Sequence, residues 1–268
     1  MTRDGPEKVD EPGAGATGRS GWLFCPGPRV LLALVLATAS VAGWALAWSA
    51  SRVLTPVVRV CLDAWEHPLR CEGGRWAFPD ARPHLVAETR DLAIVVDPEH
   101  SGGLRSPAMF QIQWGRQSLR VYGPLGWREW SFPADWTFEL DPQVMRARWE
   151  AWRPFVWLTL GVGTALGLMG IWFACACVYG LGLAVMAVCL GRRGSAGLIF
   201  RCGWAVQLPG AWLMTVAVAG YGQGWLDLAD LVVAWVWHWV VTVLLVLVTP
   251  LGLPRRAGKR GEENPFLA

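Results

Sequence analysis

Charged residues are missing from four long stretches of this 268-residue chain: residues 30–51, 155–191, 202–226 and 231–254. A membrane-spanning helix needs about 20 consecutive apolar residues, because hydrocarbon offers the backbone no other hydrogen-bond partner. A buried helix of a soluble protein rarely stays uncharged over such a length. The missing charge excludes a single soluble globule and predicts an α-helical membrane protein with four transmembrane helices.

The composition excludes two further classes of protein. A hydrophobic fraction of 53% is too high for an intrinsically disordered chain. A formal net charge of +3 is too small for the basic surface of a nucleic-acid-binding protein. We therefore expect the lipid bilayer as a partner and no nucleic acid.

Catalytic and cofactor-binding motifs are also missing. The three glycines within residues 220–224 lack the lysine and the preceding strand of a phosphate-binding loop. There is no paired-histidine zinc motif and no Gly-x-Ser-x-Gly nucleophile turn. Four residues near one apolar run could bind a cation, but acidic residues are common in solvated turns: Asp91, Asp97, Glu99 and His100. We predict no catalytic residues, no cofactor and no metal site, and hence a protein that is not an enzyme.

Residues 52–154 have the composition of a soluble domain, with 26 charged residues among 103. The apolar run 92–96, closed by Asp97-Pro98, predicts a buried strand. Residues 109–114 and 118–122 predict a hairpin around residues 115–117, and residues 127–132 and 136–140 predict two more strands. The Asp141-Pro142 pair is typical of a helix start. A small β-rich domain with flanking helices is therefore expected between the first two spans.

The number of spans depends on residues 155–191. One helix of that length would be about 55 Å long, well beyond a 30 Å hydrocarbon core. Two spans would leave no residues for a polar turn, and residues 180–182 are the one candidate break. We expect one long or broken helix, which gives four spans and an extracytoplasmic domain at 52–154. Two spans would instead place that domain in the cytoplasm.

The distribution of cations predicts the orientation. Residues 192–201 contain three arginines, and the tail 255–268 contains four cations, whereas the loop 227–230 contains Asp227 and Asp230 and no cation. Cytoplasmic loops are enriched in Lys and Arg. We therefore expect both termini in the cytoplasm, with residues 1–29 as a disordered tail preceding an uncleaved first span at 30–51.

A few residues within or beside the expected spans are candidates for a specific role. Gln207, Pro209 and His238 could form an intramembrane polar site or hinge, or Gln207 could bridge a kinked helix to its neighbour. Gly163 and Gly167 favour close helix packing, within the chain or in a homodimer. Cys61 and Cys71 could form a disulfide if their domain is extracytoplasmic, or remain unpaired thiols.

Three segments carry a resemblance to a known family. Residues 68–74 read Pro-Leu-Arg-Cys-Glu-Gly-Gly, residues 91–98 are an apolar run ending in Asp97-Pro98, and residues 201–209 end in Gln-Leu-Pro. They resemble a strand with a glycine turn, an apolar strand and the third helix of an uncharacterised bacterial family of polytopic membrane proteins, a domain of unknown function sometimes labelled maltodextrin-utilisation protein. The resemblance implies one N-terminal span, an extracytoplasmic β insert and a C-terminal helical block, with no known catalytic residues.

Together these features predict a multi-pass protein of a bacterial plasma (inner) membrane. The predicted role is that of a non-enzymatic sensor, scaffold or accessory subunit. Its extracytoplasmic domain would contact an unknown protein partner or small ligand. The alternative is a permease component with a path near Gln207, Pro209 and His238.

Overall fold

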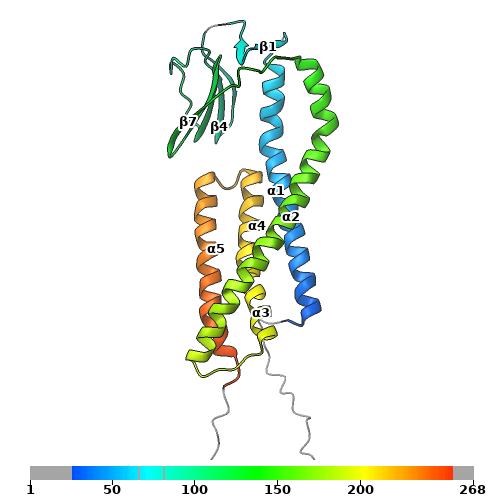
Figure 1. The fold of residues 1–268 in the computed structure, drawn as a ribbon, viewed down its shortest axis with the longest axis vertical. Coiled ribbons are helices and arrows are strands. Elements are labelled where there is room, and N and C mark those ends of the chain that lie inside the picture. Colours follow the sequence, from blue (N-terminus) through cyan, green and yellow to red (C-terminus); the bar gives the residue numbers. More distant parts are fainter. Residues whose placement is uncertain (1–25, 66, 81, 256–268) are drawn as a thin grey trace, which may run out of the picture.

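The computed structural model describes residues 26–65, 67–80 and 82–255. Predictions for the N-terminal tail 1–29 and the basic tail 255–268 fall almost entirely outside these residues. Within these described residues, four helical segments are long and apolar enough to cross a membrane: Pro28–Asp63, Pro142–Cys189, Ala196–Gln223 and Leu228–Gly252. They form one elongated bundle, and two β-sheets sit together at one end of it (Figure 1).

The two longest helices carry the β-sheets. Helix α1 (Pro28–Asp63) and helix α2 (Pro142–Cys189) extend beyond the upper ends of α4 (Leu208–Gln223) and α5 (Leu228–Val248), as Figure 1 shows. Helix α2 is continuous through Gly180 and Gly182, so no break divides residues 155–191 into two spans. Its first residue follows Asp141, whose carboxylate accepts hydrogen bonds from the backbone N–H groups of Gln143 and Val144, as the Asp-Pro pair predicts.

The third candidate span is two helices rather than the single helix expected over residues 202–226. Helix α3 (Ala196–Ala205) ends just before Gln207, and α4 begins with Leu208-Pro209. Proline has no N–H to donate and its ring crowds the carbonyl four residues earlier, which favours a break at Pro209, although α1 and α2 continue through Pro56 and Pro154. The span is therefore offset at residues 206–207, and its first helix starts six residues earlier than the charge-free stretch indicates.

The cationic connections lie at the end of the bundle opposite the β-sheets. The α2–α3 connection meets the chain after η1 (Thr249–Gly252), where Arg192 and Arg255 form a β-bridge. The backbone N–H of Arg193 also donates to the carbonyl of Pro254 at 2.9 Å. Asp227, which caps α5, lies at the other end, on the same side as the sheets. The charge asymmetry of the sequence is thus an asymmetry between the two ends of the structure.

Close packing of α1 and α2 involves different glycines from those that the sequence pattern suggests. Gly163 and Gly167 have no atom of another element within 4 Å of the position of a Cβ, so they make no close helix contact within the described chain, and the homodimer alternative stays a prediction. Their side of α2 faces away from α1. The backbones of α1 and α2 instead meet at Gly43 and Gly161, two residues before Gly163 and hence on another face of the helix.

The larger sheet has five strands in the order β3-β4-β5-β6-β7. All neighbours are antiparallel except β4 and β5, which are parallel. The predicted buried strand (β4) and the predicted hairpin (β5–β6) are both confirmed. The strand bounds are β3 (His84–Glu88), β4 (Leu92–Val96), β5 (Phe110–Trp114), β6 (Ser118–Gly123) and β7 (Gly126–Ser131).

A second sheet of three strands, in the order β2-β1-β8, closes the domain core. Its strands are β1 (Leu69–Glu72), β2 (Arg75–Ala77) and β8 (Phe138–Leu140), so the last predicted strand belongs to this sheet and is shorter than expected. The core between the sheets contains Leu69, Cys71, Trp76, Phe78 and Val96. The Trp76 and Trp114 rings meet edge to face with centroids 4.9 Å apart.

Cys61 and Cys71 are unpaired thiols, so the disulfide alternative is not realised. The Cys71 side chain points into the domain core and is fully buried there. Its thiol lies 3.8 Å from the carbonyl oxygen of Trp136. Cys61 lies instead near the end of α1 and is partly exposed. Burial raises the pKa of the Cys71 thiol, so it is a core residue in its neutral form.

Candidate functional site

The lower edge of the five-stranded sheet rests on the helical bundle. Strand β3 runs toward the bundle and β4 runs away from it, so their turn is the domain's point of contact. In that turn Asp91 accepts a hydrogen bond of 2.9 Å from the hydroxyl of Tyr221, in the last turn of α4. The neighbouring Arg90 donates to the backbone carbonyl of Leu226, in the α4–α5 loop. The β domain is thus tied to the far side of the bundle as well as to its own two helices.

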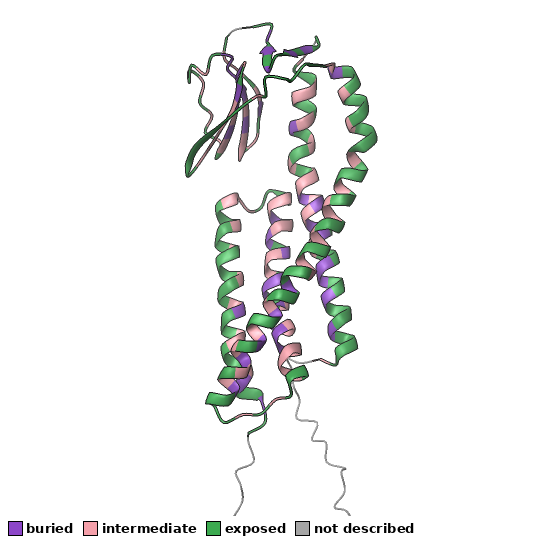
Figure 2. Ribbon diagram, viewed as in Figure 1, coloured by how far each residue is buried: buried purple, intermediate pink, exposed green. Residues whose placement is uncertain are grey.

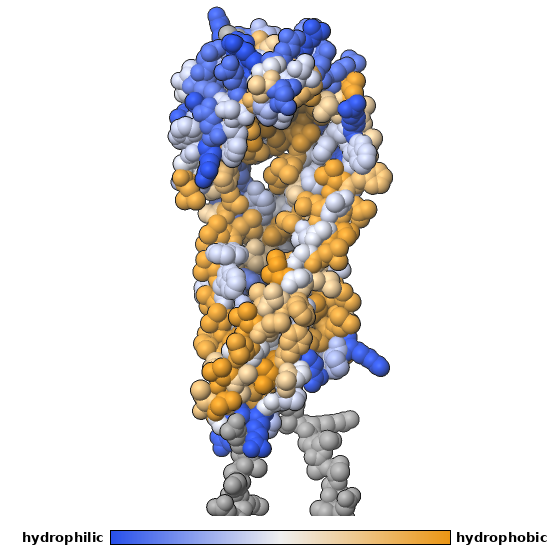
Figure 3. Space-filling model, viewed as in Figure 1, coloured by the Kyte–Doolittle hydropathy of each residue, from blue (hydrophilic) through white to orange (hydrophobic). Residues whose placement is uncertain are grey.

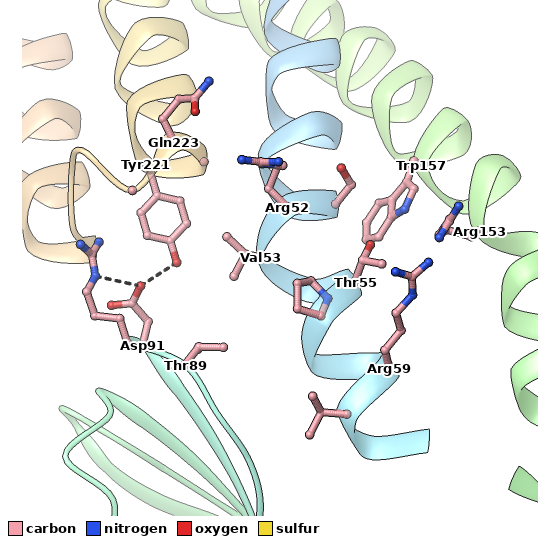
Figure 4. A pocket seen from close by; sticks show the side chains of 16 residues that line it. Arg52, Val53, Thr55, Arg59, Thr89, Asp91, Arg153, Trp157, Tyr221 and Gln223 are labelled. Atoms are coloured by element: carbon pink, nitrogen blue, oxygen red, sulfur yellow. Dashed lines mark hydrogen bonds and ion pairs between the residues drawn. The ribbon is translucent and has the colours of Figure 1, made fainter. Parts of the chain in front are cut away.

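A chamber of about 1020 Å³ lies between this turn and the bundle. Its walls come from the upper part of α1, the first half of α2, the end of α4 and the β3–β4 turn (Figure 4). Figure 3 shows the hollow below the hydrophilic cap of the domain, with hydrophobic surface around it. The chamber is open to its surroundings, and because four separate segments line it, it keeps this lining only when the domain is docked on the bundle.

Arginine is the main charged residue of the chamber. Four arginines line it, against one carboxylate: Arg52, Arg59, Arg90, Arg153 and Asp91. Just outside the lining, Glu150 pairs with Arg59 at 3.0 Å and with Arg153 at 2.9 Å. Arg90 lies 3.8 Å from Asp91. Arg52 has no carboxylate within ion-pair distance in the described chain and lies 6.0 Å from the ring of Trp48.

An apolar groove continues from the chamber down the face between α1 and α2. The groove has a volume of about 460 Å³, and Ser51 and Trp157 belong to the walls of both spaces. Its other walls are mainly hydrophobic: Trp44, Ala47, Trp48, Leu158, Gly161, Val162 and Ala165, with Ser40. The indole N–H of Trp157 is buried without an acceptor among the described residues. The charged chamber and the apolar groove therefore meet at Ser51 and Trp157.

The four residues considered for a cation do not form one site. Asp91 lies in the β3–β4 turn beside the bundle, whereas Asp97, Glu99 and His100 follow the opposite end of β4. Within residues 26–65, 67–80 and 82–255, no group of three or more His, Cys, Asp or Glu is placed to hold a metal. Glu99 pairs instead with Arg116 at 2.9 Å.

Asp97 is buried, contrary to the expectation of a solvated turn. Its carboxylate accepts hydrogen bonds from the hydroxyl of Ser101, the backbone N–H of Gly102 and the side-chain amide of Gln113. Burial alone would raise the pKa of Asp97, but these hydrogen bonds outweigh it and the pKa lies below its ordinary value. Asp97 therefore organises the turn after β4 and does not present a free carboxylate to solvent.

His100 and Ser118 come within 2.7 Å of each other, the separation of a nucleophile and its base. The Ser118 hydroxyl, however, also donates to Glu129, and Ser118 is buried. Glu129 in turn accepts from Arg120 at 3.0 Å. These groups form a polar ladder across β6 and β7 that fixes strand register. The serine is engaged on both sides, and it lines neither the chamber nor the groove.

Gln207 and His238 line one cavity of about 300 Å³ inside the bundle, between α1, α2, α4 and α5. The amide of Gln207 is already engaged, since it donates to the carbonyls of Gly203 at 2.9 Å and Trp172 at 3.1 Å. It therefore bridges the broken span to α2. His238 packs against Gly210, where a Cβ would lie 2.7 Å from the imidazole Nδ1, and that Nδ1 has no partner in the described structure. Pro209 begins α4 and is not itself in the cavity wall.

The chamber could not be derived from the sequence as a site, although one signal for it was present. Arg52 directly follows the first charge-free stretch, and Arg153 shortly precedes the second, so both lie at the domain-facing ends of uncharged stretches. Arg59 follows Arg52 by seven residues, or about two helical turns, although the two side chains extend to opposite sides of α1 in Figure 4. The contribution of Tyr221 and of the β3–β4 turn depends on domain docking, which no local pattern encodes.

Comparison of the chain with protein-family models, with curated protein sequences and with solved structures finds no match.

Proposed function

We propose that this protein is a non-enzymatic sensor or accessory subunit of a bacterial plasma membrane, in which the β domain and the transmembrane bundle share one ligand chamber. The observation that carries the proposal is the chamber itself, lined by the β3–β4 turn on one side and by three candidate spans on the other. A ligand there would contact both parts of the protein. Its binding would change the position of the domain relative to the helices, which is the physical requirement for signalling between them.

The orientation supports a chamber that opens outside the cell. Arg192, Arg193 and Arg255 lie at the end away from the domain, and cytoplasmic ends of membrane proteins are enriched in such cations. In this proposal residues 52–154 are extracytoplasmic and both termini are cytoplasmic. An unknown protein partner or a second copy of the chain would act through the domain or through the exposed faces of α2 and α5 (Figure 2).

The test is whether domain and bundle behave as one body. Spin labels at Asp135→Cys in the domain and Trp225→Cys in the α4–α5 loop, with accessible native cysteines replaced by serine, report the distance between them. Both positions are exposed. We expect a narrow distance distribution that broadens when both docking hydrogen bonds are removed by Tyr221→Phe together with Arg90→Gln. A broad distribution before that substitution would contradict the proposal.

The permease alternative is favoured by one specific observation, the cavity that brings Gln207 and His238 together. Cys175 lines the same cavity and is a native probe of water access. A water-filled path would make Cys175 react with a water-soluble thiosulfonate reagent in a variant without the other accessible cysteines. We propose a sealed bundle, in which Cys175 stays unreactive until the protein is unfolded.

A further inference from the structure

The chamber and the groove have complementary polarity and share two wall residues. Ser51 and Trp157 line both spaces, so an extended molecule can occupy them together. The upper space carries arginines, and the lower space is bounded by alanine, leucine, valine, glycine and tryptophan side chains. A molecule that fits both has a polar, charged end and an apolar end.

The charge at the upper end is positive. Four arginines meet two carboxylates, Asp91 in the wall and Glu150 behind it, which leaves an excess of two positive charges. Guanidinium groups bind phosphate by paired N–H donors, and Arg is the preferred residue for this geometry. Figure 4 shows Arg59 and Arg153 side by side next to Trp157, whereas Arg52 projects from the other side of α1.

The depth of the two spaces matches that of a lipid. Arg52 directly follows the uncharged stretch 30–51 in α1, and Arg153 precedes the uncharged stretch 155–191 in α2. Both arginines therefore lie where the hydrocarbon ends and headgroup phosphates begin. Trp44, Trp48 and Trp157 surround the groove near this boundary, where tryptophan is enriched in membrane proteins. The groove below runs along α1 and α2 within the candidate spans, at the depth of acyl chains.

We propose that the chamber and groove together bind one anionic phospholipid, with its phosphate at Arg59 and Arg153, further positive charge from Arg52, and an acyl chain along the α1–α2 groove. The proposal rests on the function proposed above and names the ligand of the same chamber. The buried N–H of Trp157, which lacks an acceptor, lies at the junction where the glycerol and ester oxygens of the lipid would be. A zwitterionic lipid would leave the excess positive charge unbalanced and would bind more weakly.

The test measures lipid binding to the full chain in lipid-free detergent micelles by thermal unfolding and native mass spectrometry. The added ligands are phosphatidylglycerol, phosphatidylcholine and inorganic phosphate. We expect phosphatidylglycerol to bind at least tenfold more tightly than phosphatidylcholine and to raise the unfolding temperature. Equal binding of the two lipids would overturn the proposal. Equal protection by millimolar inorganic phosphate would also overturn it, and would indicate a soluble anion as the ligand.

Two variants test the two ends of the site separately. Arg52→Gln with Arg153→Gln removes charge from the chamber, and Val162→Trp fills the groove without changing any charge. Each is expected to weaken phosphatidylglycerol binding at least tenfold. The control is Arg75→Gln, an exposed arginine of β2 outside the chamber, which should bind lipid like the unmodified chain. If Val162→Trp folds and binds phosphatidylglycerol with unchanged affinity, the groove is not the acyl-chain site and the proposal fails.

Failure of this proposal and failure of the proposed function give different results. A narrow domain–bundle distance together with no preference for phosphatidylglycerol would reject the lipid and keep the shared chamber. A broad distance distribution would reject the shared chamber whatever lipid binds.

Discussion

A Cβ atom on Gly43 of α1 would lie 2.3 Å from the carbonyl oxygen of Gly161 of α2. No side chain larger than hydrogen fits at that distance, because the obstacle is backbone and cannot rotate away. The helices that carry the β domain therefore cross at a pair of glycines, and the crossing fixes their relative position.

Gly43→Ala should destabilise the protein by about 1–3 kcal/mol, the usual cost of overpacking a close contact. The measurement is thermal unfolding of the full chain in one detergent. Gly163→Ala is the matched control, because a Cβ there meets no other element. In the control, alanine replaces glycine inside a helix and should be neutral or stabilising. Equal losses in both variants would show that the crossing is not a tight contact.

Gln207→Met should destabilise the bundle by about 1–3 kcal/mol, because the carbonyls of Gly203 and Trp172 lose their shared donor in a buried place. Methionine keeps the volume and removes the hydrogen bonds. The measurement is again thermal unfolding, with Gln143→Met, at an exposed position in the first turn of α2, as the control. An unchanged unfolding temperature for Gln207→Met would show that the amide is dispensable to the broken span.

Acid should weaken the β domain through Asp97. The pKa of Asp97 is lower in the folded domain than its ordinary value, so its contribution to stability is complete above the ordinary pKa and is lost as the pH falls through the folded pKa. Asp97→Asn should lower stability at neutral pH by about 1–3 kcal/mol and reduce the loss on acidification.

The measurement for Asp97 is urea unfolding at neutral and acidic pH, followed by circular dichroism of the aromatic residues. Asp135→Asn, at an exposed position in the connection between β7 and β8, is the control and should keep the pH dependence of the unmodified chain. The account of the Asp97 turn is wrong if Asp97→Asn retains that full pH dependence.

Two native cysteines can establish the topology. Cys61 lies on α1 at the domain end, and Cys189 lies at the opposite end of α2. In single-cysteine variants, a membrane-impermeant thiol reagent added to intact cells after reduction should label Cys61 and leave Cys189 unlabelled until the cells are permeabilised. Labelling of Cys61 only after permeabilisation would place the β domain in the cytoplasm.

The sequence predicts the parts of this fold that depend on local chemistry. Missing charge locates the apolar helices, the run 92–96 locates the central strand, and Asp141-Pro142 locates the start of α2. Each of these signals acts over a few residues or through the solvent that surrounds one segment. The same signals predict a β-rich segment. They do not predict that β8 pairs with β1, 66 or more residues away, to form a second sheet.

The candidate site depends on relations that no local pattern contains. Gly163 and Gly167 have the small-residue spacing, yet Gly161 makes the contact because rotation of α2 decides which glycine faces α1. Asp91 is an ordinary turn residue until Tyr221, 130 positions later in the chain, donates to it. Arg52, Arg59 and Arg153 line one chamber only because α1 and α2 pack against each other.

The Gly43–Gly161 crossing also has a mechanical consequence. From Gly43 to the end of α1 at Asp63 the helix rises about 30 Å, at 1.5 Å per residue. If the upper part of α1 rotated by about 10° around the crossing, the end of the helix at Asp63 would move by about 5 Å. A small change in the angle between α1 and α2 would thus be magnified at the end of α1, from which the chain enters the β domain.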